Sequence, residues 1–311
     1  MLLALVPRMV LRFLIAIAVG LALLVSRPLA AHAQSWEALD IAVGPDNNTR
    51  VLWSRSDGAS SLWSVSPAGA VSGFEFGPFE GWYPFVISVA PDNSTRMLRV
   101  RYDEAIGLWS VSPTGAVSGS EFGPFPGWYS YDIAVGPDNN VRALWLNRNE
   151  AISLWGVTPR GAVSGREFGP FADPLWSAHA ISVGPDNNTR VLWSRYDDAI
   201  SLWSVTPAGA VSGREFGPFP GWFAFDTAVG PDNNTRVLWR REDEAISLWS
   251  MTPSGTVSGF EFGPFPDWHA YAISVGPDNN TRVLWRRTDG AISLWSVTPS
   301  GTVSGFEFGP F

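Results

Sequence analysis

The chain contains no cysteine and no lysine, and histidine occurs only three times in its 311 residues. Without cysteine there is no disulfide bond and no thiolate chemistry, so stability outside the cell has to come from packing alone. Two histidines lie beyond the N-terminal leader, His179 and His269, and they occupy different columns of the repeat described below. A histidine-based metal site or catalytic triad is therefore poorly supported, and no cofactor is expected.

Long apolar runs are also missing, except near the N-terminus. There Arg8 and Arg12 precede the apolar run 13–25, and Ala31-His32-Ala33 matches a small-x-small cleavage site. This is the pattern of a secretory signal peptide over residues 1–33. The run is shorter than the ~20 residues that a membrane-spanning helix needs, so we expect cleavage near Ala33 rather than retention as an anchor. The mature chain is expected to be secreted, in a periplasm or outside the cell, with no membrane span.

Positive charge is scarce in the mature chain. Once Arg8, Arg12 and Arg27 are removed with the leader, 18 arginines stand against 29 acidic residues, which gives a net charge of −11. Such a balance repels phosphate backbones, so nucleic acid is not an expected partner.

Tryptophan, in contrast, is abundant, with 17 in the chain, and its spacing reveals a repeat. The period is 46 residues, with one spacing of 48 where "FADPLW" (171–176) replaces "FPGW". A fixed period of this size marks an array of supersecondary units. The six units are 36–81, 82–127, 128–175, 176–221, 222–267 and 268–311.

Each unit reads as four short strands separated by turns. In the fifth unit the strands are predicted at 225–229, 235–240, 245–251 and 256–262. The repeated "PDNN" is a turn, because Asp and Asn tolerate the left-handed region and bond their own backbone. Segments such as Val-Leu-Trp are apolar on both faces, as in a sheet covered on both sides. Four strands in 46 residues is the size of a propeller blade, so we predict an all-β, six-bladed β-propeller. Whether the ring closes at six blades is left open.

The first strand of each unit carries two further signals. Its residue before the final Val is always small, as crowding around a propeller axis requires: Ala42, Ser88, Ala134, Ser182, Ala228 and Ser274. Odd units alone carry an acid two residues earlier: Asp40, Asp132 and Asp226. In a closed ring these carboxylates would lie near the channel. Two hypotheses remain, a shared cation or ordered water, and plain solvation at a strand entrance.

The stretch "RVLWRRTDGAISLW" (282–295), followed by a fourth strand, resembles the repeat of secreted tectonin-like propeller lectins. It also resembles the repeat of bacterial fucose-binding propeller lectins. The resemblance extends over 36–311 and implies a multivalent sugar-binding propeller without catalysis. It assigns no sugar-contacting residue in this sequence.

The residues themselves suggest a ligand site made of the second-strand Trp, the Arg that follows it and the turn Asp. A Trp face stacks on the apolar face of a pyranose, and charged groups bond its hydroxyls. The alternative is that these tryptophans belong to the blade core. Arg99 replaces Trp in the second unit, and Asn147 and Asn149 replace Arg and Asp in the third. The four remaining candidate sites are Trp53, Arg55 and Asp57; Trp193, Arg195 and Asp197; Trp239, Arg241 and Asp243; Trp285, Arg287 and Asp289.

Two other columns are kept in all six units, an Arg that opens the second strand, such as Arg50, and a Glu in the fourth, such as Glu75. We expect them to pair between blades.

Near-identical copies argue against an enzyme, because catalysis places one unlike set of groups at one place. Repeated weak sites suit avidity instead. The sequence therefore predicts a secreted, multivalent, non-catalytic protein that binds glycans. The alternatives are an extracellular scaffold that binds cell-surface or envelope proteins and, less favoured, a secreted polysaccharide-degrading enzyme on a propeller.

Overall fold

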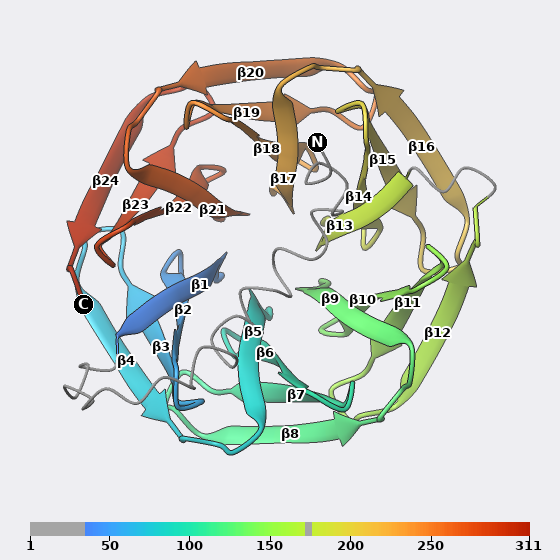
Figure 1. Ribbon diagram of the computed structural model, residues 1–311, viewed down its shortest axis with the longest axis vertical. Coiled ribbons are helices and arrows are strands. Elements are labelled where there is room, and N and C mark those ends of the chain that lie inside the picture. The colour runs from blue at the N-terminus through green and yellow to red at the C-terminus, as the bar shows by residue number, and fades with distance from the viewer. Residues whose placement is uncertain (1–34, 172–175) are drawn as a thin grey trace, which may run out of the picture. The chain divides into compact units, whose positions relative to one another are not determined.

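A computed structural model of the chain describes residues 35–171 and 176–311. The predicted signal peptide lies outside the described residues. The described part forms a six-bladed β-propeller, which confirms the predicted fold class (Figure 1). The first strand of every blade lies innermost and the fourth lies on the outer rim. The described residues contain no helix that could cross a membrane.

All six blades have the same four-strand composition. Blade 1 contains β1 (Trp36–Val43), β2 (Thr49–Arg55), β3 (Ser60–Val65) and β4 (Val71–Phe76); blade 2 contains β5 (Trp82–Val89), β6 (Thr95–Arg101), β7 (Ile106–Val111) and β8 (Val117–Phe122); blade 3 contains β9 (Trp128–Val135), β10 (Val141–Asn147), β11 (Ile152–Val157) and β12 (Val163–Phe168). Blade 4 contains β13 (Trp176–Val183), β14 (Thr189–Arg195), β15 (Ile200–Val205) and β16 (Val211–Phe216); blade 5 contains β17 (Trp222–Val229), β18 (Thr235–Arg241), β19 (Ile246–Met251) and β20 (Val257–Phe262); blade 6 contains β21 (Trp268–Val275), β22 (Thr281–Arg287), β23 (Ile292–Val297) and β24 (Val303–Phe308).

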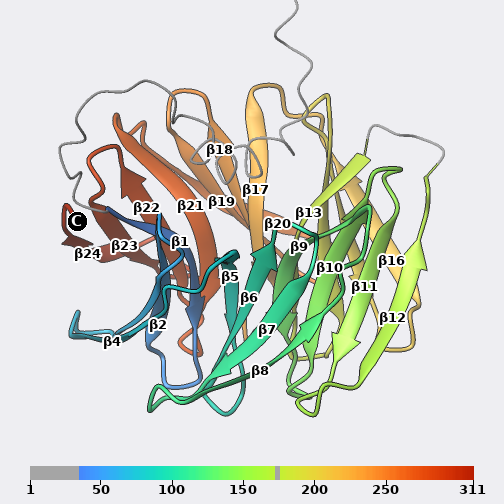
Figure 2. The ribbon, with the colours of Figure 1, turned by 60° about the horizontal axis from the view of Figure 1, so that its bottom comes forward.

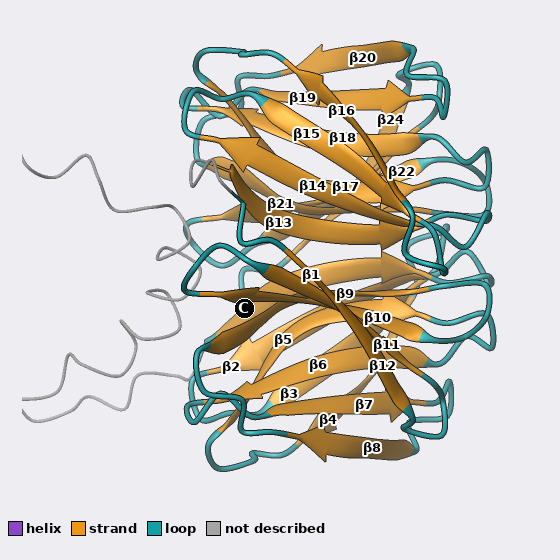
Figure 3. Cartoon of the chain, turned by 90° about the vertical axis from the view of Figure 1, so that its right-hand side faces the viewer, coloured by secondary structure: helices purple, strands orange, loops and turns teal. Residues whose placement is uncertain are grey.

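Within a blade the strands pair antiparallel in chain order, so each blade is one continuous piece of chain. Viewed from the side, the strands cross the molecule between two faces that are made of turns and loops (Figure 3). Every first strand contains a register shift, which in β1 falls between Ala38 and Asp40. A bulge of this kind bends the strand and re-aims the neighbouring side chains.

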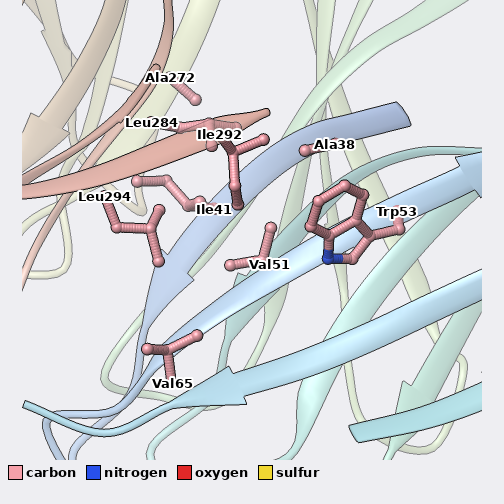
Figure 4. Packing of buried hydrophobic residues seen from close by; sticks show 9 residues of the cluster. All are labelled: Ala38, Ile41, Val51, Trp53, Val65, Ala272, Leu284, Ile292 and Leu294. Carbon is pink, nitrogen blue, oxygen red and sulfur yellow. The ribbon is translucent and has the colours of Figure 1, made fainter. Parts of the chain in front are cut away.

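The hydrophobic core lies between blades rather than inside any one of them. Val51 and Trp53 of blade 1 pack in one cluster with Leu284 and Ile292 of blade 6 (Figure 4). Burying a large apolar side chain contributes about 1.5–3 kcal/mol, and a lone blade would leave both apolar faces in water. The apolar pattern on both faces of the second strand is therefore explained by a neighbouring blade on either side.

The innermost strands are linked by two alternating hydrogen-bonded contacts, which we call the inner clasps. In odd blades an aspartate bridges forward: Asp40 accepts from its neighbour Ile41 N and from Ile87 N of blade 2, both at 2.8 Å. Asp132 and Asp226 make the same pair of bonds. From two even blades a serine hydroxyl bridges forward: Ser274 Oγ accepts from Val43 N and Ser88 Oγ accepts from Val135 N, both at 3.0 Å. Ser182 Oγ of blade 4 has no hydrogen-bond partner among the described residues. The alternation of Asp and Ser in the sequence thus reflects two kinds of blade contact.

A second ring of contacts, the hairpin belt, consists of the Asp, the first Asn and the Arg of each "PDNNTR" hairpin. Arg142 donates to Asp138 of its own hairpin at 2.7 Å and to Asn187 of the next blade at 3.2 Å. Asn187 Nδ2 returns a bond to Asp138 at 3.0 Å. The first Asn adopts a left-handed backbone, with φ of 58° at Asn47. The repetition of the "PDNNTR" motif is therefore explained by the bonds that each copy makes to the next copy.

The hairpin belt corrects one expectation from the sequence. Arg50 bonds to Asp46 at 2.7 Å and to Ser64 at 3.0 Å, within its own blade, and not to a fourth-strand glutamate. The predicted Arg50–Glu75 type of pairing between blades is wrong. The fourth-strand glutamates lie instead beside the arginines that end the second strands, as Glu307 does beside Arg287.

The ring closes between blade 6 and blade 1, which lie side by side in both ribbon views (Figure 2). Asn47 Nδ2 donates to Asp278 at 3.1 Å, so the hairpin belt continues across this junction. Phe311 packs edge-on against Trp53 and Trp63, with ring centroids 5.0 and 5.2 Å apart. Closure therefore uses the same kinds of contact as the four junctions between blades 2 and 6, without exchange of a strand between blades.

Candidate functional site

The second-strand tryptophans, which were predicted to stack on sugars, lie in the core. Trp53, Trp239 and Trp285 are each 1% exposed and Trp193 is 2% exposed. The Trp285 ring is enclosed by Trp295 at 4.8 Å and by Phe265 at 5.3 Å between ring centroids. Phe265 comes from the loop that leaves blade 5, so this aromatic cluster seals a blade junction. The predicted stacking of a pyranose on these tryptophan faces is wrong, because the faces are not open to solvent.

A cavity of about 150 Å³ nevertheless lies at the junction of blades 5 and 6. Its lining residues are Phe265, Trp268, Trp285, Ser293, Trp295 and Glu307. Trp285, Ser293 and Glu307 are aligned across β22, β23 and β24 in the sheet register, so they share one face of the blade. We call this cavity with its lining the junction site.

The rim of the junction site is a charged network anchored on Arg287. Arg287 donates through Nε and Nη2 to Asp289 at 3.0 and 2.9 Å, and through Nη1 to Glu307 at 3.1 Å. Its guanidinium lies 4.9 Å from the ring centroid of Trp268, the half-buried first-strand tryptophan. The hydrogen bond from Arg287 lowers the pKa of the Asp289 carboxyl. Asp289 also accepts from Ala291 N at 3.0 Å, so it orients the arginine and the turn.

The floor of the junction site presents a buried donor. Trp285 lines the cavity, and its indole Nε1 has no acceptor within the described residues. Trp53, Trp145, Trp193 and Trp239 present the same unpartnered Nε1. A buried N–H without an acceptor costs about 1–3 kcal/mol, so a ligand hydroxyl that reached it would gain a favourable bond. Figure 4 shows the nitrogen of the equivalent Trp53 at the junction of blades 6 and 1.

The same constellation recurs around the ring with two exceptions. The second-strand arginine stacks on the first-strand tryptophan in blades 1, 4 and 5, for the pairs Arg55–Trp36, Arg195–Trp176 and Arg241–Trp222. In blade 3 Asn147 accepts from Asn149 N and Ala151 N and serves only the turn. In blade 2 Arg101 keeps the stacking on Trp82, but Arg99 replaces the indole floor.

The sequence identified the arginine–aspartate pair and Trp285, the latter as a stacking face, but not the other residues of the junction site. The first-strand tryptophans, such as Trp268, were used only to mark the period, and Glu307 was assigned to a structural pairing. The antiparallel register places Trp268 directly opposite Arg287. That pairing was the available signal, because both positions repeat at the same distance from the hairpin turn.

Asp40, Asp132 and Asp226 do line a central cavity of about 160 Å³, together with the small residues of the first strands. Their carboxylate oxygens are engaged by backbone N–H groups in the inner clasps. Within residues 35–171 and 176–311, no group of three acidic or histidine side chains is placed to hold a metal ion. The predicted shared cation is therefore not supported, and these acids link blades instead.

No protein-family model matches this sequence, and no curated protein matches it either. Solved structures of the same architecture do. The fungal lectin of Aleuria aurantia, described as a six-bladed β-propeller with a novel fucose recognition mode, is 13% identical, with a TM-score of 0.61 over 88% of this chain and 94% of that chain. The SapL1 lectin, solved with alpha-methyl fucoside, is 15% identical, with a TM-score of 0.62 over 89% and 98%. AofleA from Arthrobotrys oligospora is 11% identical, with a TM-score of 0.63 over 88% and 90%.

At these identities the likeness establishes the fold. Two of the three structures are of lectins, and one of them holds a fucoside. They do not test the resemblance to tectonin-like or bacterial propeller lectins, which stays a prediction.

Proposed function

We propose that the chain is a secreted, multivalent, non-catalytic carbohydrate-binding protein whose sugars occupy the junction sites. The observation that supports this most is the combination found at the junction of blades 5 and 6. Aromatic walls, a buried indole donor, a serine hydroxyl and a glutamate acceptor surround one cavity. Apolar walls with a few convergent polar groups are typical of small-molecule sites, and a sugar offers both apolar C–H faces and hydroxyls.

The ligand class that we propose is a neutral sugar, with fucosides as the first candidates. This choice is supported by the fucoside in the SapL1 lectin and by the fucose recognition ascribed to the Aleuria aurantia lectin. The arginine stacked on tryptophan, its aspartate partner and the indole floor occur together in blades 1, 4, 5 and 6, so about four sites per chain are expected. Several modest contacts made at once raise apparent affinity by ~10²–10⁴.

A glycan array probed with the protein, followed by calorimetric titration with alpha-methyl fucoside, tests the proposal. We expect selective binding of glycans and about four equivalent sites. Glu307→Gln removes an acceptor charge at one site only and should lower the number of sites by about one. An array without any bound glycan would leave the alternative of a protein-binding scaffold.

Secretion and the lack of catalysis belong to the same proposal. The pattern of residues 1–33 supports export, and N-terminal sequencing of the exported protein should start near Gln34. Repetition supports a lack of catalysis, because each rim acid has counterparts in other blades. Release of reducing ends from a bound polysaccharide would contradict that part of the proposal.

A further inference from the structure

Blade 2 departs from the repeat at two positions that face each other. Arg99 on β6 stands where the other blades have tryptophan, and Gly107 on β7 stands where they have serine. The two residues are direct partners in the antiparallel register, as Trp285 and Ser293 are in blade 6. Both changes therefore fall at the positions that are equivalent to Trp285 and Ser293 of the junction site, here at the junction of blades 1 and 2.

Arg99 is fully buried, with 0% of its surface exposed. Its guanidinium carbon lies 4.3 Å from the ring centroid of Trp109 and 4.5 Å from that of Phe79. Nη2 donates to Trp82 O at 3.0 Å and makes a long contact of 3.5 Å to Gly58 O. Nε and Nη1 have no acceptor among the described residues.

This arginine also has no carboxylate partner in the described part of the chain. The rim acid Asp103 bonds to Arg101 at 2.8 Å, and Glu121 interacts with the same arginine. Burial lowers the pKa of Arg99 to about 10, which still leaves it charged at neutral pH. A buried charge without a partner is strongly destabilising, so Arg99 adds a positive charge that its own blade leaves uncompensated.

Gly107 gives this site more room. The backbone there does not require glycine, since a Cβ atom would meet its nearest neighbours, Trp82 and Trp109 Nε1, at 3.4 and 3.7 Å, which is ordinary contact. Gly107 therefore leaves unfilled the space that a serine side chain fills in the other blades, and Arg99 Cβ lies 3.8 Å from the position of the missing Cβ. A fully buried floor residue can still face a ligand cavity, because Trp285, at 1% exposure, does so in blade 6.

We propose that the junction of blades 1 and 2 binds an acidic sugar, with the free Nε–H and Nη1–H of Arg99 donating to the sugar carboxylate. This deepens the proposed function, on which it rests: the other junction sites take neutral sugars and this one takes an anion. Donation from a guanidinium to a carboxylate is a strong, charge-assisted bond. The carboxylate supplies the counter-charge that Arg99 lacks.

The test compares methyl glycosides of glucuronic, galacturonic and N-acetylneuraminic acids with their carboxyl-reduced counterparts, titrated into the full chain. For at least one acid we expect about tenfold or tighter binding than for its reduced form, since hydrogen bonds to charged groups are the stronger class. The preference should weaken as salt concentration rises. Equal binding of every acid and its reduced form would overturn the inference.

The matched variant is Arg99→Trp with Gly107→Ser, which gives blade 2 the residues that the other five blades have at these two positions. It should lose the preference for the acid while neutral sugars still bind at blades 1, 4, 5 and 6. If this pair impairs folding, Arg99→Gln removes the charge with less change in shape and should lose the same preference. Retention of the preference in a folded variant would overturn the inference. If neutral sugars bind but no acidic sugar is preferred, this inference alone is contradicted. If no sugar binds at all, the proposed function is contradicted as well.

Discussion

The indole ring of Trp285 packs as a core side chain but carries a donor at its edge. Phenylalanine keeps an aromatic ring against Phe265 and Trp295, but it removes Nε1 together with part of the ring volume. Trp285→Phe should therefore weaken sugar binding at its junction site by about 3–10-fold, the value of one neutral hydrogen bond. The free energy of unfolding should fall by about 1–3 kcal/mol, because the smaller ring leaves part of a buried space unfilled. Calorimetric titration and urea unfolding give the two quantities.

Truncation at the same residue separates packing from donation. Trp285→Ala leaves a cavity in the junction and should cost about 3–5 kcal/mol of stability. If Trp285→Phe proved as destabilising as Trp285→Ala, the indole edge that carries Nε1 would contribute to the stability of the fold rather than to ligand binding. If it left sugar binding unchanged, the indole would not be the floor of the site.

The residues show which side-chain roles can be predicted from sequence. Trp53 and Arg55 are two positions apart, so the pattern places them on the same face of β2. It does not show that Phe311 from the sixth unit covers Trp53 and leaves Arg55 half-exposed at the rim. Phe311 lies far from Trp53 in the sequence, in a different repeat unit. The pattern within a single unit therefore does not reveal this contact.

At the scale of strands and hairpins, the inner clasps make a separate contribution to stability. Asp40→Ala leaves Ile41 N and Ile87 N without their acceptor and should cost about 1–3 kcal/mol, the penalty of an unsatisfied buried group. Asp40→Asn retains one carbonyl oxygen and should cost less. Urea unfolding measures both, and Glu80→Ala, an exposed acid, controls for the change in net charge. Equal losses in Asp40→Ala and Glu80→Ala would show that the clasp does not stabilise the ring.

The hairpin belt should make the protein sensitive to acid. Burial raises the pKa of Asp138, but the bonds from Arg142 and Asn187 outweigh it and lower the pKa to about 2. A carboxyl whose pKa is lower in the folded than in the unfolded chain stabilises the folded chain at pH values above the pKa in the unfolded chain, ~3.9. That stabilisation is lost as pH falls from about 4 to about 2. Melting temperature should therefore drop over this interval, and by less in Asp138→Asn.

The hairpin belt shows which features of the hairpins could be predicted from the sequence and which could not. The sequence indicated a turn at "PDNN" and four strands per unit, because those features depend on local backbone preferences. It misassigned the partner of Arg50 to a fourth-strand glutamate, whereas the structure pairs Arg50 with Asp46, four residues earlier in the same hairpin.

A constant melting temperature between pH 4 and pH 2 would contradict the hairpin belt as the source of acid sensitivity.

At the scale of the whole molecule, the ring closes through contacts between blade 6 and blade 1. Phe311→Ala removes the ring that covers Trp53 and Trp63 and should lower the melting temperature. The cost should be about 1–3 kcal/mol, because Phe311 is partly exposed and a full core truncation costs about 3–5 kcal/mol. Phe74→Ala is the control, as Phe74 is similarly exposed on the outer rim, at 40% against 42%, away from the closing junction. An equal effect of the two variants would mean that Phe311 adds nothing to closure.

The central claim is that sugars occupy the blade junctions, and the indole N–H signals of the tryptophans test it most directly. The glycan ranked highest on the array is titrated into the isotope-labelled protein while the indole ¹H–¹⁵N resonances are followed, with Trp285 assigned through Trp285→Phe. The account predicts that the resonance of Trp285 and those of its counterparts Trp53, Trp193 and Trp239 shift together as the sites fill. Saturation with the glycan while these four resonances stay in place would contradict it.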